Sequence, residues 1–351
     1  MFKKKWFRVA VTLLFVLAFL VLKTYRDAGE FKAIQAIGGQ ECRLVSGVQS
    51  SEDITIHPKT GMAFISSDDR RAFVQGLTSQ PGAIYGFDLT SSEPVLVNLT
   101  PTLPFEFHPH GIGLYIDDSD STWLFVVNHR EDASYVEIFQ FDGSRLRYVE
   151  SIHGERMHSP NDVLPVGRRQ FYVTNDHGNT SKLGRLLEEY LQLARSHLLY
   201  YDGHSFREVA GGFGYANGVN MSPDGRRLYV AATTSKAVFV FNRDPHSGDL
   251  TPRQRIDLGT GVDNIEVDAN GDLWIGAHPK LLTFVAYSKD ANKLSPSQVV
   301  RIHWRGEGNF DINYMYSSDG RPLSGSSVVA VWGEHLLIGS VFDPAFLWCK
   351  R

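Results

Sequence analysis

A short motif recurs six times along the chain, and it restricts the possible folds more than any other feature. Each copy has a polar or glycine residue, then an Ile or Val, then a turn and a hydrophobic strand. The apolar positions of the six copies are Ile54, Ile112, Val163, Val219, Ile265 and Val328. Successive positions lie 58, 51, 56, 46 and 63 residues apart, which leaves room for about four short strands in each copy. The repeat therefore predicts a six-bladed β-propeller.

The sequence between the motifs supports an all-β fold. Short runs rich in Val, Ile, Phe and Tyr alternate with clusters of Pro, Gly, Asp and Asn, as expected for strands joined by turns. The clearest runs are residues 62–66, 123–127, 171–174, 228–232 and 336–338. A length of 351 residues would suggest two domains, but no linker rich in Pro, Ser or Gly divides the chain. We therefore expect one propeller domain over residues 27–351.

The first 26 residues differ from the rest and predict an exported protein. They contain six Lys and Arg residues and no acid, and residues 9–22 form an apolar run, which is the pattern of a signal sequence or signal anchor. The run is short for a membrane span, but residues 23–27 contain no small-x-small cleavage site, so we interpret residues 1–26 as a retained anchor. Basic residues on its N-terminal side place the remainder outside the cytoplasm, beside a membrane surface. A buried helix of a soluble domain is the alternative.

The distribution of charge excludes one class of partner. The formal net charge is −4, and the six basic residues of the first 26 therefore leave −10 on the rest of the chain. A body this acidic is a poor ligand for phosphates, so nucleic acid is excluded as a partner. Acidic groups are better suited to binding a cation.

Two cysteines, Cys42 and Cys349, lie near the two ends of the exported part. An even number of cysteines in an oxidising compartment predicts one disulfide, and two unpaired buried thiols are the alternative. The bond would close a loop of about 300 residues and would join the first element of the fold to the last, where a circular architecture has to be closed.

The polar positions of the motif are expected to meet in space. The innermost strand of each blade lines the central channel of a propeller, so residues at equivalent starts of these strands converge. The convergent set is Glu52, Asp53, His110, Asn161, Asp162, Asn217, Asp263 and Asn264. Nearly all of them supply oxygen and none supplies a thiol, which suits Ca²⁺ better than Zn²⁺. The alternative is that these Asn and Asp residues only cap turns.

At these residues the chain resembles the paraoxonase family, the calcium-dependent lactonases and arylesterases built on six-bladed propellers. The similarity extends from about Cys42 to Cys349. The matching segments are residues 51–54, 63–67, 108–112, 126–129, 161–163, 174–177, 216–218, 222–225, 262–265, 271–274, 336–339 and 341–342. Each segment is short, but their order and spacing together are specific.

The resemblance implies two calcium ions in the channel. The residues that match the ligands of the upper, catalytic ion are Glu52, Asn161, Asn217, Asp263 and Asn264. Those that match the ligands of the buried, structural ion are Asp53, Asp162 and the backbone carbonyl of Ile112. The residues His110 and His129 match a pair that prepares a water nucleophile, and His278 matches a further histidine near that site.

One segment departs from the β pattern. From Leu183 the apolar residues fall at 0, +3, +4, +7, +8, +11 and +15, which predicts an amphipathic helix over residues 183–198. Because it follows residues 174–177 closely, we expect it near the channel mouth. It either packs on the propeller or contacts a membrane and guides the tails of amphiphilic lactones along Leu187, Leu191 and Leu198.

Other routes to hydrolysis find no support in the sequence. It contains no Gly-x-Ser-x-Gly elbow, no His-Glu-x-x-His, no Cys-x-x-Cys and no phosphate-binding loop. The function we infer is a calcium-dependent hydrolysis of lactones and aryl esters. A sugar lactonase of the gluconolactonase type and a non-catalytic propeller that only binds a ligand are the alternatives. No feature of the sequence predicts an oligomeric state.

Overall fold

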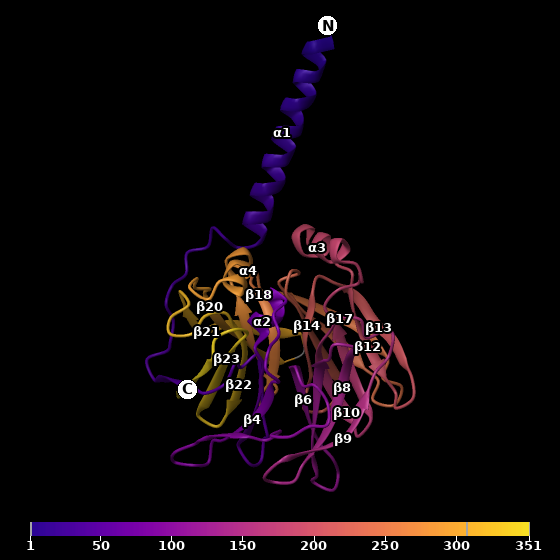
Figure 1. The fold of residues 1–351 in the computed structure, drawn as a ribbon, viewed down its shortest axis with the longest axis vertical. Helices are drawn as coiled ribbons and strands as arrows, with labels where there is room; N and C mark the ends of the chain where they lie inside the picture. Colours follow the sequence, from indigo (N-terminus) through magenta and orange to yellow (C-terminus); the bar gives the residue numbers. More distant parts are fainter. Residues whose placement is uncertain (1, 307, 351) are drawn as a thin grey trace.

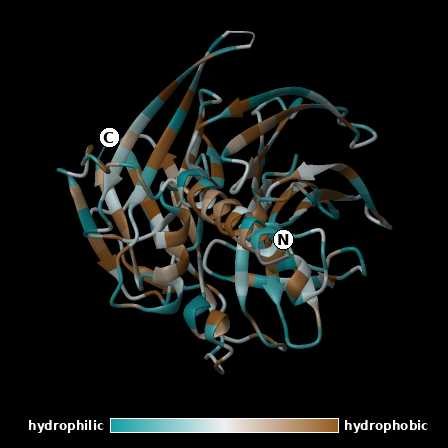
Figure 2. Ribbon diagram, turned by 90° about the horizontal axis from the view of Figure 1, so that it is seen from above, coloured by the Kyte–Doolittle hydropathy of each residue, from teal (hydrophilic) through white to brown (hydrophobic). Residues whose placement is uncertain are grey.

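The computed structural model describes residues 2–306 and 308–350, and in them six four-stranded antiparallel sheets surround a central axis (Figures 1 and 2). The predicted six-bladed β-propeller is confirmed. Four helices accompany the blades in the described part of the chain: α1 (Phe2–Asp27), α2 (Arg70–Gln75), α3 (Lys182–Leu191) and α4 (Leu281–Lys289). Helix α1 projects from one face of the propeller, and α3 and α4 lie on that same face (Figure 1).

Five blades each use four strands that are consecutive in the sequence. The first blade contains β2 (Asp53–Ile56), β3 (Met62–Ser67), β4 (Ala83–Asp88) and β5 (Leu96–Asn98). The second contains β6 (Pro109–Ile116), β7 (Thr122–His129), β8 (Ser134–Phe141) and β9 (Leu146–Ile152). The third contains β10 (Pro160–Gly167), β11 (Gln170–Asn175), β12 (Ser196–Tyr201) and β13 (Phe206–Phe213).

The remaining three blades complete the ring. The fourth contains β14 (Ala216–Met221), β15 (Arg227–Ala232), β16 (Ala237–Arg243) and β17 (Leu250–Asp257). The fifth contains β18 (Gly261–Val267), β19 (Leu273–His278), β20 (Ser297–Gly306) and β21 (Asn309–Ser318). The sixth contains β22 (Ser326–Trp332), β23 (His335–Ser340) and β24 (Ala345–Lys350), with β1 (Cys42–Ser46) as its outer strand.

The strands that carry the repeated motif are the ones that line the channel. They are β2, β6, β10, β14, β18 and β22, and each contacts the corresponding strand of the neighbouring blade around the ring. This arrangement explains the repeat, because every blade has to present an equivalent edge to the same axis.

The hydrophobic core lies between the blades. Each of the six buried clusters in the described part of the chain draws its residues from two neighbouring blades. In β3, Ala63 and Ile65 face the sixth blade, whereas Phe64 between them faces the second. Successive side chains of a strand point to opposite faces, and both faces of these sheets are buried. The sequences of the strands are therefore continuous runs of apolar residues.

The ring is closed by the two ends of the propeller chain. Strand β1 pairs antiparallel with β24, and Cys42 lies opposite Cys349. The two cysteines form a disulfide across a sequence separation of 307 residues. The predicted disulfide between the first and last elements is therefore present.

The predicted helix over residues 183–198 is shorter than expected. Helix α3 ends at Leu191, and Gln192 follows with a left-handed backbone φ of 54°. The prediction for Leu198 is wrong, since it lies in β12 and is fully buried between blades. Residues 198–201, Leu-Leu-Tyr-Tyr, pair with both neighbouring strands instead of continuing the helix, because tertiary packing overrides the local helical period.

We predict that Cys349→Ser lowers the free energy of unfolding by about 2–5 kcal/mol. Without the disulfide the unfolded chain has more conformational freedom, which stabilises the unfolded state. Urea unfolding of the purified protein measures the change. The Cys42→Ser variant and the double variant should lose the same amount, since both remove the same bond. Three unequal losses would contradict an effect that acts through closure of the ring.

Candidate active site

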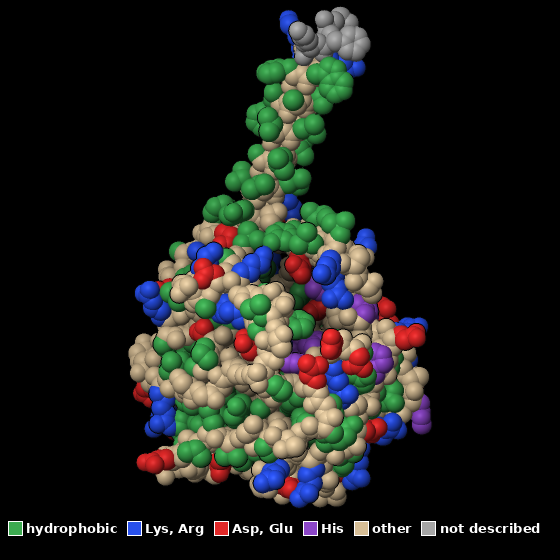
Figure 3. All heavy atoms as spheres, in the orientation of Figure 1, with side chains coloured by type: hydrophobic (Ala, Val, Ile, Leu, Met, Phe, Trp, Pro, Cys, Tyr) green, Lys and Arg blue, Asp and Glu red, His purple; other side chains and the backbone are tan. Residues whose placement is uncertain are grey.

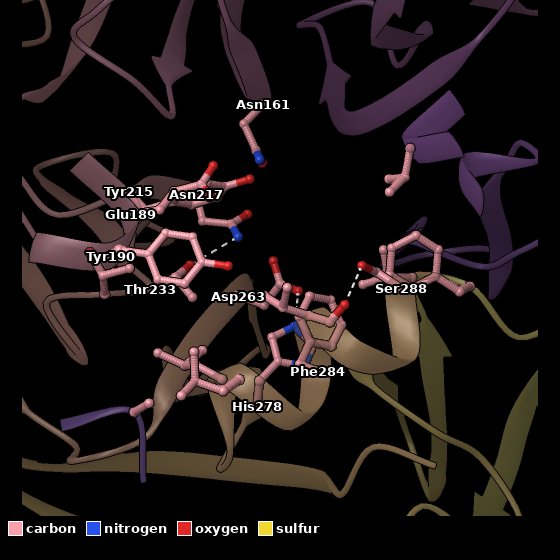
Figure 4. Close-up of a pocket in the computed structure, with 18 of the residues that line it drawn as sticks. Asn161, Glu189, Tyr190, Tyr215, Asn217, Thr233, Asp263, His278, Phe284 and Ser288 are labelled. Atoms are coloured by element: carbon pink, nitrogen blue, oxygen red, sulfur yellow. Dashed lines mark hydrogen bonds and ion pairs between the residues drawn. The ribbon is translucent and has the colours of Figure 1, made fainter. Parts of the chain in front are cut away.

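A cavity of about 380 Å³ opens at one end of the central channel. Residues at the starts of the inner strands form its floor, and α2, α3, α4 and the end of α1 contribute its walls. The predicted site residues that line it are Glu52, His110, Asn161, Asn217, Asp263 and His278. In Figure 4 the side chains of Asn161, Asn217 and Asp263 point into the same space. The ring thus brings together side chains that the sequence distributes over five blades.

A register shift explains how two successive motif residues both serve the channel. In β6, β10, β14, β18 and β22, the pairing with the next strand is interrupted at the motif. Asn161 and Asp162, for example, lie between the paired positions Pro160 and Val163. Such a bulge bends the strand and redirects its side chains. Asn161 consequently lines the 380 Å³ cavity, and Asp162 lines a second cavity of about 180 Å³ farther along the channel.

Five buried oxygen atoms of the channel's motif residues accept no hydrogen bond from the described residues. They are Glu52 Oε2, Asn161 Oδ1, Asn217 Oδ1, Asp263 Oδ1 and Asn264 Oδ1. A buried oxygen without a donor costs about 1–3 kcal/mol, so these five need water or a cation as a partner. Two carboxylates and three amides are hard oxygen donors of the kind that Ca²⁺ takes. The residues present therefore fit a calcium ion.

Hydrogen bonds hold the amides with their oxygens inward. Asn217 donates through Nδ2 to Thr233 Oγ1 at 3.1 Å, and Asn264 donates through Nδ2 to the backbone oxygen of Glu52 at 3.1 Å. Each amide uses its nitrogen for the protein and leaves its Oδ1 free for the channel. Ser327 also donates to the Glu52 backbone oxygen, at 2.6 Å, which fixes the loop that carries this carboxylate.

His278 orients Asp263 from outside the oxygen cluster. Its Nε2 lies 2.7 Å from Asp263 Oδ2, so the other carboxylate oxygen is the one left without a donor. Burial raises the pKa of Asp263, and the hydrogen bond to His278 acts in the opposite direction. Phe284 of α4 stacks on the His278 ring with 3.9 Å between ring centroids. The cavity wall and the acidic floor are therefore in direct contact.

The two predicted catalytic histidines form a hydrogen-bonded pair. His110 Nδ1 lies 2.9 Å from His129 Nε2, and His129 Nδ1 lies 3.0 Å from Ser134 Oγ. His110 Nε2 lies 3.5 Å from Glu52 Oε1. Desolvation and the neighbouring His110 hold the pKa of His129 well below its usual range, so this ring is neutral at pH 7. If the neutral His129 carries its hydrogen on Nδ1 and donates it to Ser134, its Nε2 accepts a hydrogen bond from His110 Nδ1.

Burial works against ionisation of Glu52, but His110 and Arg70 outweigh it and lower the pKa of Glu52 to about 2. This carboxylate is therefore anionic at every physiological pH. A permanently charged oxygen beside three neutral amide oxygens attracts a divalent cation without fully neutralising it.

The predicted lower set lies deeper in the channel. Asp53, Asp162 and Ile112 all line the 180 Å³ cavity. Asp53 accepts the backbone N–H groups of Ile54 and Ile112, and Asp162 accepts those of Val163 and Val219, all at 2.7–2.9 Å. Burial still raises the pKa of both carboxyls well above the usual range. Two buried carboxylates at the same depth favour a cation between them.

Sequence reasoning missed several residues of the cavity wall. Arg70 of α2 lines the cavity, and its Nη2 lies 3.5 Å from His110 Nδ1. Tyr215 and Phe284 also line it. Short helices such as α2 and α4 show no long apolar period, and these residues lie outside the repeated motif, so no signal in the sequence indicated them.

The residues of α3 that line the cavity differ from those expected. Leu186 and Tyr190 line it, whereas Leu187 and Leu191 do not, although all four side chains are about equally exposed. The prediction was one helical position off, because the direction of the helix relative to the channel decides which part of a broad apolar stripe faces inward.

Helix α3 is tied to the channel rim by an ion-pair network. His177 contacts Asp176 Oδ1 at 2.6 Å through Nδ1 and Glu189 Oε1 of α3 at 3.0 Å through Nε2. Burial lowers the pKa of His177, but the two carboxylates outweigh it and raise the pKa to about 9. The histidine is therefore charged at neutral pH and links two carboxylates.

Comparison with known proteins gives a consistent result. A model of the family described as Arylesterase matches residues 33–350. Serum paraoxonase/arylesterase 2 of Rattus norvegicus is 35% identical over 340 residues, covering 95% of this chain and 94% of that protein. Serum paraoxonase/arylesterase 1 of Homo sapiens is 36% identical over 328 residues, covering 91% of each.

Solved structures of lower identity share the architecture. A luciferin-regenerating enzyme superimposes with a TM-score of 0.56 at 10% identity, covering 91% of this chain and 96% of that one. A gluconolactonase of Xanthomonas campestris gives a TM-score of 0.53 at 16% identity, covering 91% and 95%. At these identities the likeness concerns the fold alone.

We predict that removal of Ca²⁺ by a chelator lowers the midpoint of thermal unfolding and that added Ca²⁺ restores it, because an ion that binds only the folded state stabilises it. Asn161→Ala should shift the Ca²⁺ dependence of the midpoint to higher concentration. Asn242→Ala, at an exposed position of β16, serves as the control and should respond like the wild type. An unchanged midpoint after chelation would refute a calcium site.

The raised pKa of His177 predicts a pH-dependent contribution to stability. A base whose pKa rises from 6.5 to about 9 on folding stabilises the protein fully below pH 6.5, and this contribution is lost as the pH rises through about 9. The difference in unfolding free energy between the wild type and His177→Gln should therefore shrink between pH 6.5 and pH 9.5. Urea unfolding at four pH values measures it, and a constant difference would contradict a charged His177.

Proposed function

The chain belongs to the arylesterase family, and on that premise we propose that it is a calcium-dependent hydrolase of lactones and aryl esters. The observation that carries this proposal is the cluster of five unsatisfied buried oxygens beside the His110–His129 pair. A cation site next to a hydrogen-bonded histidine pair, under a cavity of about 380 Å³, combines an electrophile, a base and room for a small ester.

When bound, calcium would polarise the ester carbonyl and stabilise the oxyanion that forms as water adds. Glu52, Asn161, Asn217, Asp263 and Asn264 would hold this upper ion. The amides serve this role because a neutral oxygen binds the ion without cancelling its charge. Hydrogen bonds to Thr233 and His278 keep Asn217 and Asp263 in position before substrate arrives.

The histidine pair would supply the base. His110 accepts the proton of a water molecule at Nε2, the nitrogen that faces Glu52 and the cavity, and its Nδ1–H points to His129 Nε2. A His129 that donates through Nδ1 to Ser134 accepts the Nδ1–H of His110, and so it leaves Nε2 of His110 unprotonated, which is the tautomer that a base at Nε2 needs. Glu52 and Asp263 are rival bases on the ion.

We assign the lower set, Asp53, Asp162 and the carbonyl of Ile112, to a second calcium with a structural role. Its two carboxylates are buried and have raised pKa values, and no histidine lines the cavity around them. An ion there would stabilise the inner strands of several blades without contacting substrate.

We propose that residues 1–26 act as a signal anchor for an exported hydrolase domain over residues 27–351. Helix α1 is apolar enough over Lys4–Asp27 to span a membrane and is exposed along its length. Figure 3 shows hydrophobic side chains along α1 and again on the propeller face beneath it. The exposed apolar residues of α3, which we call the mouth patch, are Leu183, Leu186, Leu187, Tyr190 and Leu191. Such a patch beside an anchor favours contact with a lipid surface.

We predict that the specificity constant for lactones rises with the length of the alkyl tail, by at most about fourfold for each methylene that is fully buried. The tail would lie along Leu186 and Tyr190 in the cavity wall. Leu186→Asp should flatten this dependence, whereas Leu191→Asp, at a position that does not line the cavity, should keep it when both are assayed in detergent. A chain-length series with purified protein provides the measurement.

Two further outcomes of the same series separate the alternatives. His110→Gln should depress all lactones alike, because it removes the base and leaves the tail site intact. Faster turnover of short sugar lactones than of long-tailed ones would favour the gluconolactonase-type alternative. No turnover of any ester in the presence of Ca²⁺, with ligand binding retained, would favour a non-catalytic module.

A further inference from the structure

The start of helix α4 is capped by a residue from a distant part of the chain. The residue that precedes the helix, Lys280, makes no side-chain cap hydrogen bond. Instead, Glu30 Oε1 accepts the backbone N–H groups of Leu282 at 2.8 Å and Thr283 at 3.1 Å. The Thr283 hydroxyl donates to Glu30 Oε2 at 2.6 Å. A carboxylate at this end satisfies free backbone donors and interacts favourably with the helix dipole.

The segment that carries Glu30 is held in place on both sides. The carbonyl of Ala28 accepts the backbone N–H of Leu281 at 2.9 Å, and Lys236 Nζ donates to the Asp27 carbonyl at 2.7 Å. Gly29 has a φ of +79°, and a Cβ there would lie 2.2 Å from the carbonyl oxygen of Pro279. The turn after α1 is therefore fitted against the loop that leads into α4.

The capped helix forms a wall of the catalytic cavity. Leu281, Phe284 and Ser288 all line the cavity. Phe284 lies on the His278 ring, with an interplanar angle of 27°, and His278 in turn contacts Asp263. A continuous series of contacts thus joins Glu30, just outside the anchor helix, to an oxygen ligand at the cavity floor.

We propose that Glu30 is a positioning residue of the active site. By capping α4 from the anchor side, it fixes the height and tilt of the helix, and so it holds Phe284 against His278 and Asp263. The kinetic part of this proposal rests on the proposed hydrolase function, but the structural part does not. The proposal also requires that the working protein retains residues 27–30, so that any removal of the anchor has to occur before Asp27.

A matched variant distinguishes capping of α4 from attachment of the N-terminal segment to the propeller. Lys32 donates through Nζ to the carbonyl of Gly259 at 2.5 Å, so it ties the same segment to the propeller without touching α4. Lys32→Met therefore removes a comparable tether and leaves the cap intact. Glu30→Ala removes the cap, and Glu30→Gln keeps one oxygen acceptor but loses the charge.

The experiment uses the full-length protein in detergent and three measurements. The first is hydrogen exchange of the backbone amides over residues 281–285, which reports the cap directly. The second is the Ca²⁺ concentration that produces half of the thermal stabilisation, which reports Asp263. The third is the separation of kcat from KM for a long-tailed lactone.

For Glu30→Ala we expect amide exchange in this segment to rise about three- to tenfold, since a lost cap costs about that factor in helix opening. The half-saturating Ca²⁺ concentration and KM should both rise several-fold. Glu30→Gln should lie between Glu30→Ala and the wild type, and Lys32→Met should match the wild type in all three measurements.

Three results would overturn the proposal or part of it. Unchanged amide exchange in Glu30→Ala would mean that Glu30 does not cap α4. Faster exchange with unchanged Ca²⁺ dependence and KM would restrict Glu30 to a local structural role. Equal effects of Glu30→Ala and Lys32→Met would indicate fastening alone. If even the wild type hydrolysed no lactone, the proposed function would fail, while exchange and Ca²⁺ titration would still decide the role of Glu30.

Discussion

The channel exists only while six blades form a closed ring, because each sheet buries both faces against its neighbours. The inner strands β2 and β22 contact each other across the point where the ring closes, and the Cys42–Cys349 disulfide joins β1 to β24, the two outer strands of the sixth blade. Glu52 lies beside that junction, and its backbone oxygen accepts hydrogen bonds from Asn264 and Ser327 of the fifth and sixth blades. An open ring would therefore lose both the last buried interface and the geometry of the oxygen cluster.

Closure of the ring concentrates negative charge on the axis, and the two ends of the channel differ in the hydrogen bonds that their oxygens receive. The lower carboxylates, Asp53 and Asp162, each receive two backbone N–H groups, so the fold itself satisfies them in part. The five upper oxygens without a donor receive none, although the amide nitrogens of Asn217 and Asn264 are bonded. A folded chain that leaves one end unsatisfied is less stable without a ligand. That difference leaves the upper end with more unsatisfied oxygens for a ligand than the lower end has.

The sequence predicted the site residues that belong to the motif repeated in the blades. It missed the site residues of segments that occur only once. The motif placed Asn161, Asn217 and Asp263 together because equivalent positions of equivalent strands must converge. Helix α3 was predicted too long, since a local apolar period does not reveal that residues 198–201 pair as a strand. Arg70 and Glu30 belong to segments that occur once, and their roles depend on contacts with residues 40 and about 250 positions away. No local pattern records such contacts.

The contacts between Glu30 and α4 also limit where the cavity can lie relative to a membrane. Ala28 is buried and bonded to Leu281, one residue after α1 ends at Asp27, so no flexible tether separates the helix from the propeller. With α1 in a lipid bilayer, the cavity mouth would lie directly at its surface, bordered by the mouth patch on α3. An amphiphilic ester could then enter from the lipid side with its tail already desolvated, whereas a polar sugar lactone would have to enter around the rim. The position of α1 would thus favour the same class of substrate as the apolar residues of the cavity wall.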